Sequence, residues 1–246
     1  GREALGAHLA ALEYFDATAL RLLSQACRRR DPGFPPPPRD GVCALYVEIE
    51  SDQRSLTEAA ARLIAETLSS AGCDPSASDS VWAAATARDL EALKQFRHAV
   101  PEEVNGIIAA RRRQHAGITK VGTDLAVPDA RLRDVFALYR QGLASHGLQG
   151  VIFGHVGDNH VHVNMLPEDM RQYREAQALY RHWAEQAVAW GGTVAAEHGI
   201  GKLKTGLLGL LYGPRELDAM RDLKKRFDPE GRLNPGTLFA AGSQKA

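Results

Sequence analysis

The sequence lacks several features that mark broad classes of protein. None of its apolar runs approaches the roughly 18 residues of a membrane-spanning helix, so we expect no transmembrane segment. Thirty Lys and Arg residues balance thirty Asp and Glu residues. A net charge of zero gives no support for binding to nucleic acid or to an anionic membrane surface, and we expect no nucleic-acid partner.

Cysteine is scarce, and two common motifs are missing. Cys27, Cys43 and Cys73 form an odd, scattered set without a CxxC pair, which argues against a disulfide framework and a cysteine zinc site. This usage predicts a reducing, cytoplasmic location, and it leaves peripheral contact with a membrane open. Neither a GxGxxG motif nor a P-loop is present, so no segment predicts a nucleotide-phosphate site by itself.

Helical and strand patterns alternate along the chain. Residues 8–28 open with LAALEYFD and continue as a helix, ATALRLLSQACR. Further helices are predicted over 54–71 with Ser55 as N-cap, 88–98, from Pro101 to Arg113, 129–146, 167–190 and 214–227. Strands are predicted over 42–51, 123–128, 150–156 and 160–166, and from 193 into a glycine loop. The best fold class is α+β: a mostly antiparallel sheet with helices packed on one face and a helical tail at the C-terminus.

The stretch GHVGDNHVHVN (154–164) is dense in metal-ligating side chains. With Asp158 and Asn159 at the centre of a two-residue turn, His155 would lie opposite His162. Three histidines and an asparagine would then share one face: His155, His160, His162 and Asn164. Opposed residues have Cβ atoms about 5 Å apart, so two imidazoles could hold one metal ion. The alternative is a polar strand face packed under a helix.

A second cluster, AEHGIGKLK, places Glu197 beside His198 at the end of a predicted strand. Glycines follow, and they allow a ligand to approach the backbone closely. Two histidines and one carboxylate are a common set for a catalytic divalent ion with open coordination positions. Taken alone, the Glu-His pair is equally typical of an ordinary surface.

In that order, GHVGDNHVHVN, AEHGIGKLK and FDPEGRLNPGTLF resemble the C-terminal half of FAD-linked oxidases of the vanillyl-alcohol oxidase type, including the D-lactate, glycolate and D-2-hydroxyglutarate dehydrogenases. FRHAVPEEVN and KVGTDLAVP fit the same family. The resemblance implies a ferredoxin-like cap over about 1–190, a return segment over about 191–246, and an FAD-binding domain that is not in this chain. It also implies oxidation of a 2-hydroxy acid to the 2-oxo acid, with FAD as cofactor and an electron acceptor as partner.

The resemblance assigns roles by motif position. His155, His162 and Glu197 match the metal ligands, for an ion such as Zn or Mn. His198 matches the base that takes the hydroxyl proton, and Arg97 matches the group that pairs with the substrate carboxylate. Further substrate and flavin contacts are implied for Asn164, Lys120 and Asn234, with Glu197 and His198 also beside the cofactor.

Two positions depart from the family pattern. His160 stands where Asn is common, and it could be a third histidine ligand, a group that supports a ligand, or a tolerated change. Gly122 stands where several relatives have a lysine, and Lys120 lies two residues before it.

Two other functions remain open. HVHVNML resembles the histidine-triad signature of nucleotide hydrolases, with His162 as nucleophile, but Asn164 stands in place of the third histidine. The chain could also be a non-catalytic cap homologue that binds a metal or a partner. Homodimer formation is left open as well.

Overall fold

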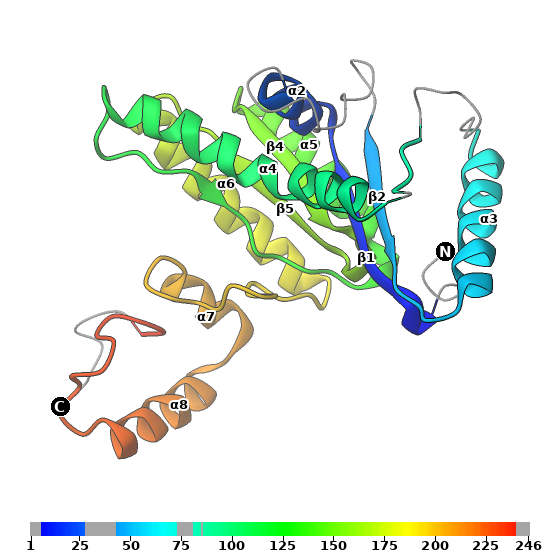
Figure 1. Ribbon diagram of the computed structural model, residues 1–246. Coiled ribbons are helices and arrows are strands. Elements are labelled where there is room, and N and C mark those ends of the chain that lie inside the picture. Colours follow the sequence, from blue (N-terminus) through cyan, green and yellow to red (C-terminus); the bar gives the residue numbers. More distant parts are fainter. Residues whose placement is uncertain (1–5, 28–42, 73–80, 85, 240–246) are drawn as a thin grey trace.

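A five-stranded antiparallel sheet forms the centre of the molecule. The computed structural model describes residues 6–27, 43–72, 81–84 and 86–239 (Figure 1). The strand order is β2-β1-β4-β5-β3, and every neighbouring pair is antiparallel. The strands are β1 (Leu9–Phe15), β2 (Ala44–Ile49), β3 (Val121–Gly122), β4 (Gly150–His155) and β5 (His160–Met165).

Seven α-helices and three short 3-10 turns accompany the sheet in the described part of the chain. The helices are α2 (Ala17–Cys27), α3 (Arg54–Ser70), α4 (Ala87–Arg112), α5 (Leu132–Ser145), α6 (Met170–Ala189), α7 (Thr205–Leu211) and α8 (Pro214–Phe227). The turns are η1 (Gly6–His8), η2 (Asp129–Arg131) and η3 (Val156–Asp158). The α+β class and the helical C-terminal tail are therefore confirmed.

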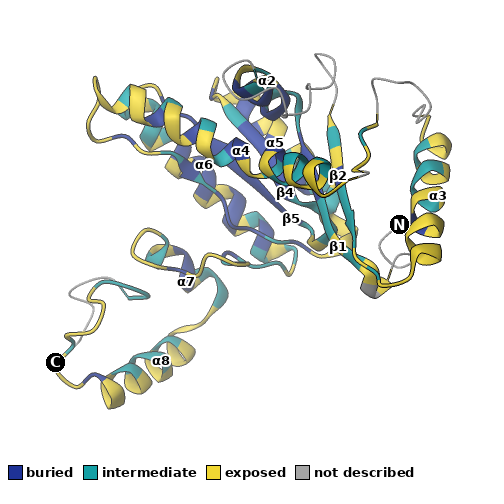
Figure 2. Ribbon diagram, viewed as in Figure 1, coloured by how far each residue is buried: buried dark blue, intermediate teal, exposed yellow. Residues whose placement is uncertain are grey.

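Helices cover both faces of the sheet, which corrects the expectation that they pack on one face. Side chains alternate along a strand, so Val151 and Phe153 of β4 face one side and Ile152 faces the other. The first side packs against buried residues of α2 and α4, such as Leu23 and Val100. The second side packs against α5 and α6, and the layers in Figure 2 follow this division. The central strands β4 and β5 are thus largely buried on both faces.

Several strand predictions need correction. LAALEYFD is not part of a helix: residues 9–15 are strand β1, which pairs with β2 and places Tyr14 and Phe15 in the two cores. A short apolar run fits both the helical and the strand period, and pairing with other strands decides which structure forms. Residues 123–128 are not a strand, and neither is the segment from 193. They meet through one isolated bridge, between Ala126 and Thr193.

Helix boundaries also differ at two places. Pro101 does not divide two helices, because α4 runs through it without a break. A capping box between Thr86 and Asp89 fixes the start of α4, and burial of Val100 and Val104 holds the helix on the sheet. Ser55 lies inside α3, whose N-cap is Gln53. Helix α7 was not predicted.

The C-terminal tail leaves the sheet after α6 and carries α7 and α8 away from it (Figure 1). Residues 228–239 after α8 form turns, as expected. Among the helices of the described ranges, none combines the length and hydropathy that crossing a membrane requires. Cys43 is a free thiol, and Cys73 lies outside the described residues.

Candidate metal centre and active site

The β4–β5 hairpin gathers three imidazoles on one face of the sheet. His155 lies opposite His160, and Phe153 lies opposite His162, so the predicted pairing of His155 with His162 is wrong. The turn spans four residues rather than two, with Asn159 in the left-handed region at φ 52°. The register differs by two residues, and a shift of two keeps every side chain on its predicted face. His155, His160 and His162 therefore still point the same way.

Glu197 completes this cluster from a distant part of the sequence. Its Oε1 lies 3.0 Å from His162 Nε2, and its Oε2 lies 3.3 Å from His155 Nε2. One ligand atom from each of four residues lies within 4.8 Å of the others: His155, His160, His162 and Glu197. The structure thus brings together the three side chains that the sequence assigned to a metal.

Glu13 of β1 supports the cluster from one side. Its side chain is 4% exposed, and its Oε1 accepts from His155 Nδ1 at 2.8 Å and from Arg97 Nη2 at 2.6 Å. A carboxylate only accepts hydrogen bonds, so the proton of neutral His155 sits on Nδ1 and its Nε2 lone pair faces Glu197. This arrangement is typical of histidines that bind metals.

Asp124 supports the cluster from the other side and positions Glu197. This carboxylate is 1% exposed and accepts from the backbone N–H groups of Glu197 and His198, each at 3.1 Å. Lys204 Nζ donates to it at 2.6 Å, and His160 Nε2 lies 3.2 Å from it. One buried anion therefore links the segment before α5, the hairpin and the glycine loop.

The charges of the site shift several pKa values. Burial alone would raise the pKa of Glu197, but His155, His162 and their neighbours lower it overall. The hydrogen bond from His155 to Glu13 raises the pKa of His155. Burial lowers the pKa of His162, which favours the neutral form of that imidazole. For Asp124, the adjacent His160 ring and the hydrogen bond from Lys204 outweigh burial and lower its pKa.

The donor atoms fit a divalent metal ion. The backbone carbonyl oxygen of Thr123 accepts a hydrogen bond from His162 Nδ1 at 3.1 Å. The proton of neutral His162 therefore lies on Nδ1, and its Nε2 lone pair faces Glu197 Oε1 at 3.0 Å. Two acceptors at this separation repel unless a cation lies between them. A divalent ion such as Zn or Mn therefore suits this set.

His198 borders the cluster and remains accessible. Its ring stacks on His162 with the centroids 5.2 Å apart and the planes 10° from parallel. Its Nε2 lies 3.1 Å from Glu197 Oε1, and its side chain is 58% exposed. An accessible imidazole beside a metal centre can take a proton from a bound molecule.

The other predicted substrate residues lie at different depths. Arg97 projects from α4 onto Glu13 and over the Tyr46 ring at 5.7 Å, one carboxylate away from His155. Asn164 is buried on β5, on the same face as the histidines. Gly122 lies opposite it, and a Cβ there would come within 2.7 Å of Asn164 Oδ1. Lys120 is half-buried just before β3, where burial lowers its pKa.

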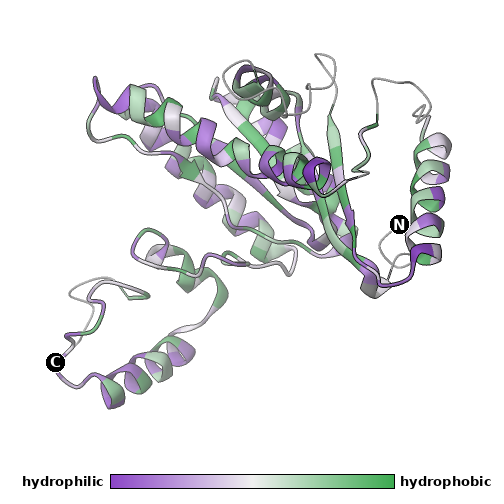
Figure 3. Cartoon of the chain, viewed as in Figure 1, coloured by the Kyte–Doolittle hydropathy of each residue, from purple (hydrophilic) through white to green (hydrophobic). Residues whose placement is uncertain are grey.

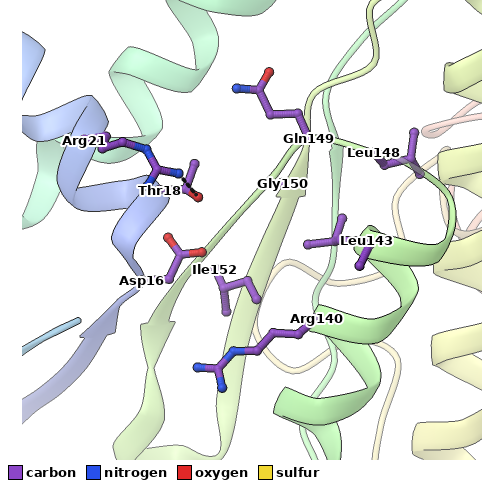
Figure 4. Close-up of a pocket in the computed structure, with 10 residues that line it drawn as sticks. Asp16, Thr18, Arg21, Arg140, Leu143, Leu148, Gln149, Gly150 and Ile152 are labelled. Carbon is purple, nitrogen blue, oxygen red and sulfur yellow. Dashed lines mark hydrogen bonds between the residues drawn. The ribbon is translucent and has the colours of Figure 1, made fainter. Parts of the chain in front are cut away.

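Asn234 is not brought into the cluster. It lies in the turns after α8 with φ 45°, in a segment that stands apart from the sheet (Figure 1). A cavity of about 340 Å³ is also separate from the metal centre (Figure 4). It lies at the Gly150 end of β4, whereas His155 is at the other end, and none of the predicted site residues lines it.

Sequence reasoning missed Glu13, Asp124 and Lys204. Glu13 is the one acidic residue inside the apolar run LAALEYF, a signal of a functional or paired carboxylate. Asp124 stands within the quoted stretch KVGTDLAVP and Lys204 within the glycine loop, but neither received a role. Only the fold shows that they meet.

The sequence of this chain is similar to known proteins. Residues 2–238 match the family described as FAD linked oxidases, C-terminal domain. A probable mitochondrial D-lactate dehydrogenase of Danio rerio is 29% identical over 197 residues, which are 79% of this chain and 37% of that protein. Glycolate oxidase subunit GlcD of Bacillus subtilis (strain 168) is 30% identical over 152 residues, 58% of this chain and 32% of that protein. The chain thus spans roughly a third of these relatives.

Solved structures share the fold. A 4-ethylphenol oxidase from Gulosibacter chungangensis superposes with a TM-score of 0.56 at 14% identity, over 95% of this chain and 48% of that one. p-Cresol methylhydroxylase gives the same TM-score at 12% identity, over 96% and 48%. The match over residues 2–238 shows that the chain belongs to the family of FAD linked oxidases, C-terminal domain.

Proposed function

We propose that this chain is the substrate-binding half of a flavin-dependent oxidoreductase that oxidises a 2-hydroxy acid to the 2-oxo acid. The observation that carries the proposal is the convergence of His155, His162 and Glu197, with His198 exposed beside them. Relatives named as D-lactate dehydrogenase and glycolate oxidase subunit support an acid of this class.

His155, His162 and Glu197 would hold the divalent ion, which lowers the pKa of a bound hydroxyl group. FAD, when bound, would supply the acceptor for a hydride from the α-carbon. His198 would take the hydroxyl proton on a ring nitrogen, and its 58% exposed side chain can reach a molecule at the edge of the cluster. Asp124 accepts from the backbone N–H groups of both Glu197 and His198 and so fixes this base relative to the ligands.

Arg97 would bind the carboxylate of the acid. Glu13 engages one guanidinium nitrogen, and the remaining N–H groups can form a bidentate pair with two oxygens. The Asn164 amide on the histidine face, with Lys120 nearby in sequence before β3, would complete the substrate contacts. Binding at both ends of a short acid would align its α-carbon with the flavin.

The partner would be an FAD-binding domain, and the C-terminal tail would meet it. Helix α8 has no buried residue, and Leu223 and Phe227 are 57% and 81% exposed. Figure 3 shows apolar segments along α8, which stands apart from the sheet. Such side chains are typical of an interface. The flavin contact of Asn234, the electron acceptor, a homodimer and the cytoplasmic location remain predictions.

Flavin reduction tests the proposal. The chain joined to its FAD-binding domain is mixed with D-lactate or glycolate, and flavin bleaching and bound metal are measured. Replacing His198 by Ala should lower the reduction rate about 10²- to 10⁴-fold, the contribution of a general base. His146→Ala, on an exposed helix end, is the matched control and should leave the rate unchanged. Unchanged rates in both His198→Ala and His155→Ala would contradict the assignment, and metal binding without flavin reduction would favour a non-catalytic cap.

A further inference from the structure

His160 is buried within the cluster formed by His155, His162 and Glu197. The residue is 4% exposed, and one of its ring nitrogens lies within 4.8 Å of the ligand atoms of His155, His162 and Glu197. Its ring centroid lies 4.4 Å from that of His162 and 5.5 Å from that of His155. Three imidazoles packed this closely are unfavourable unless a cation or another group uses them.

One nitrogen of the His160 ring has no aligned partner. Nε2 is fully buried and lies 3.2 Å from Asp124 Oδ1, but within the described part of the chain it forms no hydrogen bond. A buried polar atom in this state costs free energy unless something completes its coordination. A metal bound by this imidazole would fix the ring and allow it to turn its remaining N–H to Asp124.

The surroundings of His160 repeat those of His155. His155 has a buried carboxylate behind it, Glu13, and that carboxylate has its own cation, Arg97. His160 likewise has Asp124 behind it, with Lys204 at 2.6 Å. A carboxylate that orients a histidine is typical of metal ligation, because it fixes the tautomer and raises the basicity of the ligating nitrogen.

We infer that His160 is a fourth protein ligand, so that the centre holds its metal with three imidazoles and one carboxylate. This inference rests on the proposed metal site of His155, His162 and Glu197. A nitrogen-rich set favours Zn²⁺ or Co²⁺ over Mn²⁺. Any coordination position that these four side chains leave open would be available to an oxygen of the 2-hydroxy acid.

Metal titration of the 246-residue chain tests this inference. Zn²⁺, Co²⁺ and Mn²⁺ are titrated against a chelator into the natural chain, His160→Asn and the control His182→Asn, an exposed histidine on α6. The Kd for Zn²⁺ should rise at least about 10-fold in His160→Asn, and the visible spectrum of Co²⁺ should change. The Kd for Mn²⁺ should rise less, and His182→Asn should bind like the natural chain.

A further variant and a measurement on the natural chain separate the outcomes. If His162→Ala loses Zn²⁺ but His160→Asn keeps the natural affinity and Co²⁺ spectrum, the inference is overturned and the proposed metal site stands. If the natural chain binds none of the three ions, both are overturned. Should His160→Asn fail to fold, ¹⁵N-histidine spectra of the natural chain with Zn²⁺ decide. Three imidazoles whose ¹⁵N signals are shifted by the metal would support ligation by His160, and only two would exclude it.

Discussion

The carboxylate of Glu13 lies 2.8 Å from Nδ1 of His155, although 142 residues separate them in the sequence. The same oxygen also accepts from Arg97 at 2.6 Å. Glu13 therefore joins a residue proposed to hold the metal to a residue proposed to hold the substrate. A movement of the Glu13 carboxylate would therefore disturb its contacts with both His155 and Arg97.

Replacing Glu13 by Gln should weaken metal binding about 10- to 100-fold, because the group that orients His155 is lost. Chelator competition with Zn²⁺ measures this change. Glu48→Gln is the matched control: Glu48 lies on the adjacent strand and contacts Tyr46 and Lys94, with no ligand among its partners. Equal affinities for Glu13→Gln and the natural chain would show that Glu13 has no part in ligation.

Metal affinity should fall as the pH falls, and the fall should begin above the usual histidine pKa of about 6.5. The metal must displace a proton from His155, whose pKa is raised by its hydrogen bond to Glu13. Glu197, whose pKa is lowered, stays ionised through this range. One displaced proton corresponds to about a tenfold loss of affinity per pH unit.

Glu13→Gln should also change this pH profile. Without the carboxylate, the proton competes less for His155, so the ratio of the variant Kd to the natural Kd should be larger at pH 8 than at pH 6. Titrations at the two pH values measure the ratio. A ratio that grows toward acid would mean that His155 is not the titrating ligand.

Asp124→Asn should lower the free energy of unfolding by about 3 kcal/mol at neutral pH, because Lys204 loses its buried counter-charge. The pKa of Asp124 is lowered in the folded chain, so its stabilisation is present above the ordinary Asp pKa of about 4 and is lost as the pH falls through the folded value. Urea unfolding of the two chains should therefore converge in acid.

A second carboxylate provides the control for Asp124. Asp228 accepts from Lys224 Nζ at 2.6 Å and from two backbone N–H groups, but it lies in the tail beyond α8. Asp228→Asn should leave Zn²⁺ affinity unchanged, whereas Asp124→Asn should weaken it. Equal effects of the two changes on Zn²⁺ affinity would remove the link between Asp124 and the centre.

Gly122→Ala should destabilise the chain by about 1 to 3 kcal/mol, because the new Cβ would meet Asn164 Oδ1 at 2.7 Å. Thermal unfolding measures the loss. Gly106→Ala, on α4 with open space around it, should instead stabilise by about 1 kcal/mol. A stable Gly122→Ala chain would show that the Asn164 amide is free to turn aside.

The sequence predicts the faces of the hairpin but not its pairing. Alternation in HVHVNM places the histidines on one side whatever the turn, whereas the register depends on how residues 156–159 turn back. The strand character of residues 9–15 depends on pairing with β2 and β4, which local pattern does not contain. Pro101 misled the helix prediction because packing of Val100 and Val104 outweighs the cost of the proline.

The metal ligands could be proposed from sequence because each stands in a distinctive motif. Their supports could not. The sequence around Glu13, Asp124 and Lys204 does not show their partners, because each gains its role from a contact that bridges 80 or more residues: Glu13 to Arg97 and His155, and Asp124 to Lys204. Such roles depend on the assembled sheet, which brings strand ends and loops to one edge.

The four-residue connection between His155 and His160 limits how this hairpin can vary in length. Inserting or deleting one residue there would rotate β5 by one position and present Val161 and Val163 to the metal, with the imidazoles driven into the α5–α6 core. A gain or loss of two residues together would leave each β5 side chain on its present face. Relatives and engineered variants that keep the centre should therefore differ here by even numbers of residues.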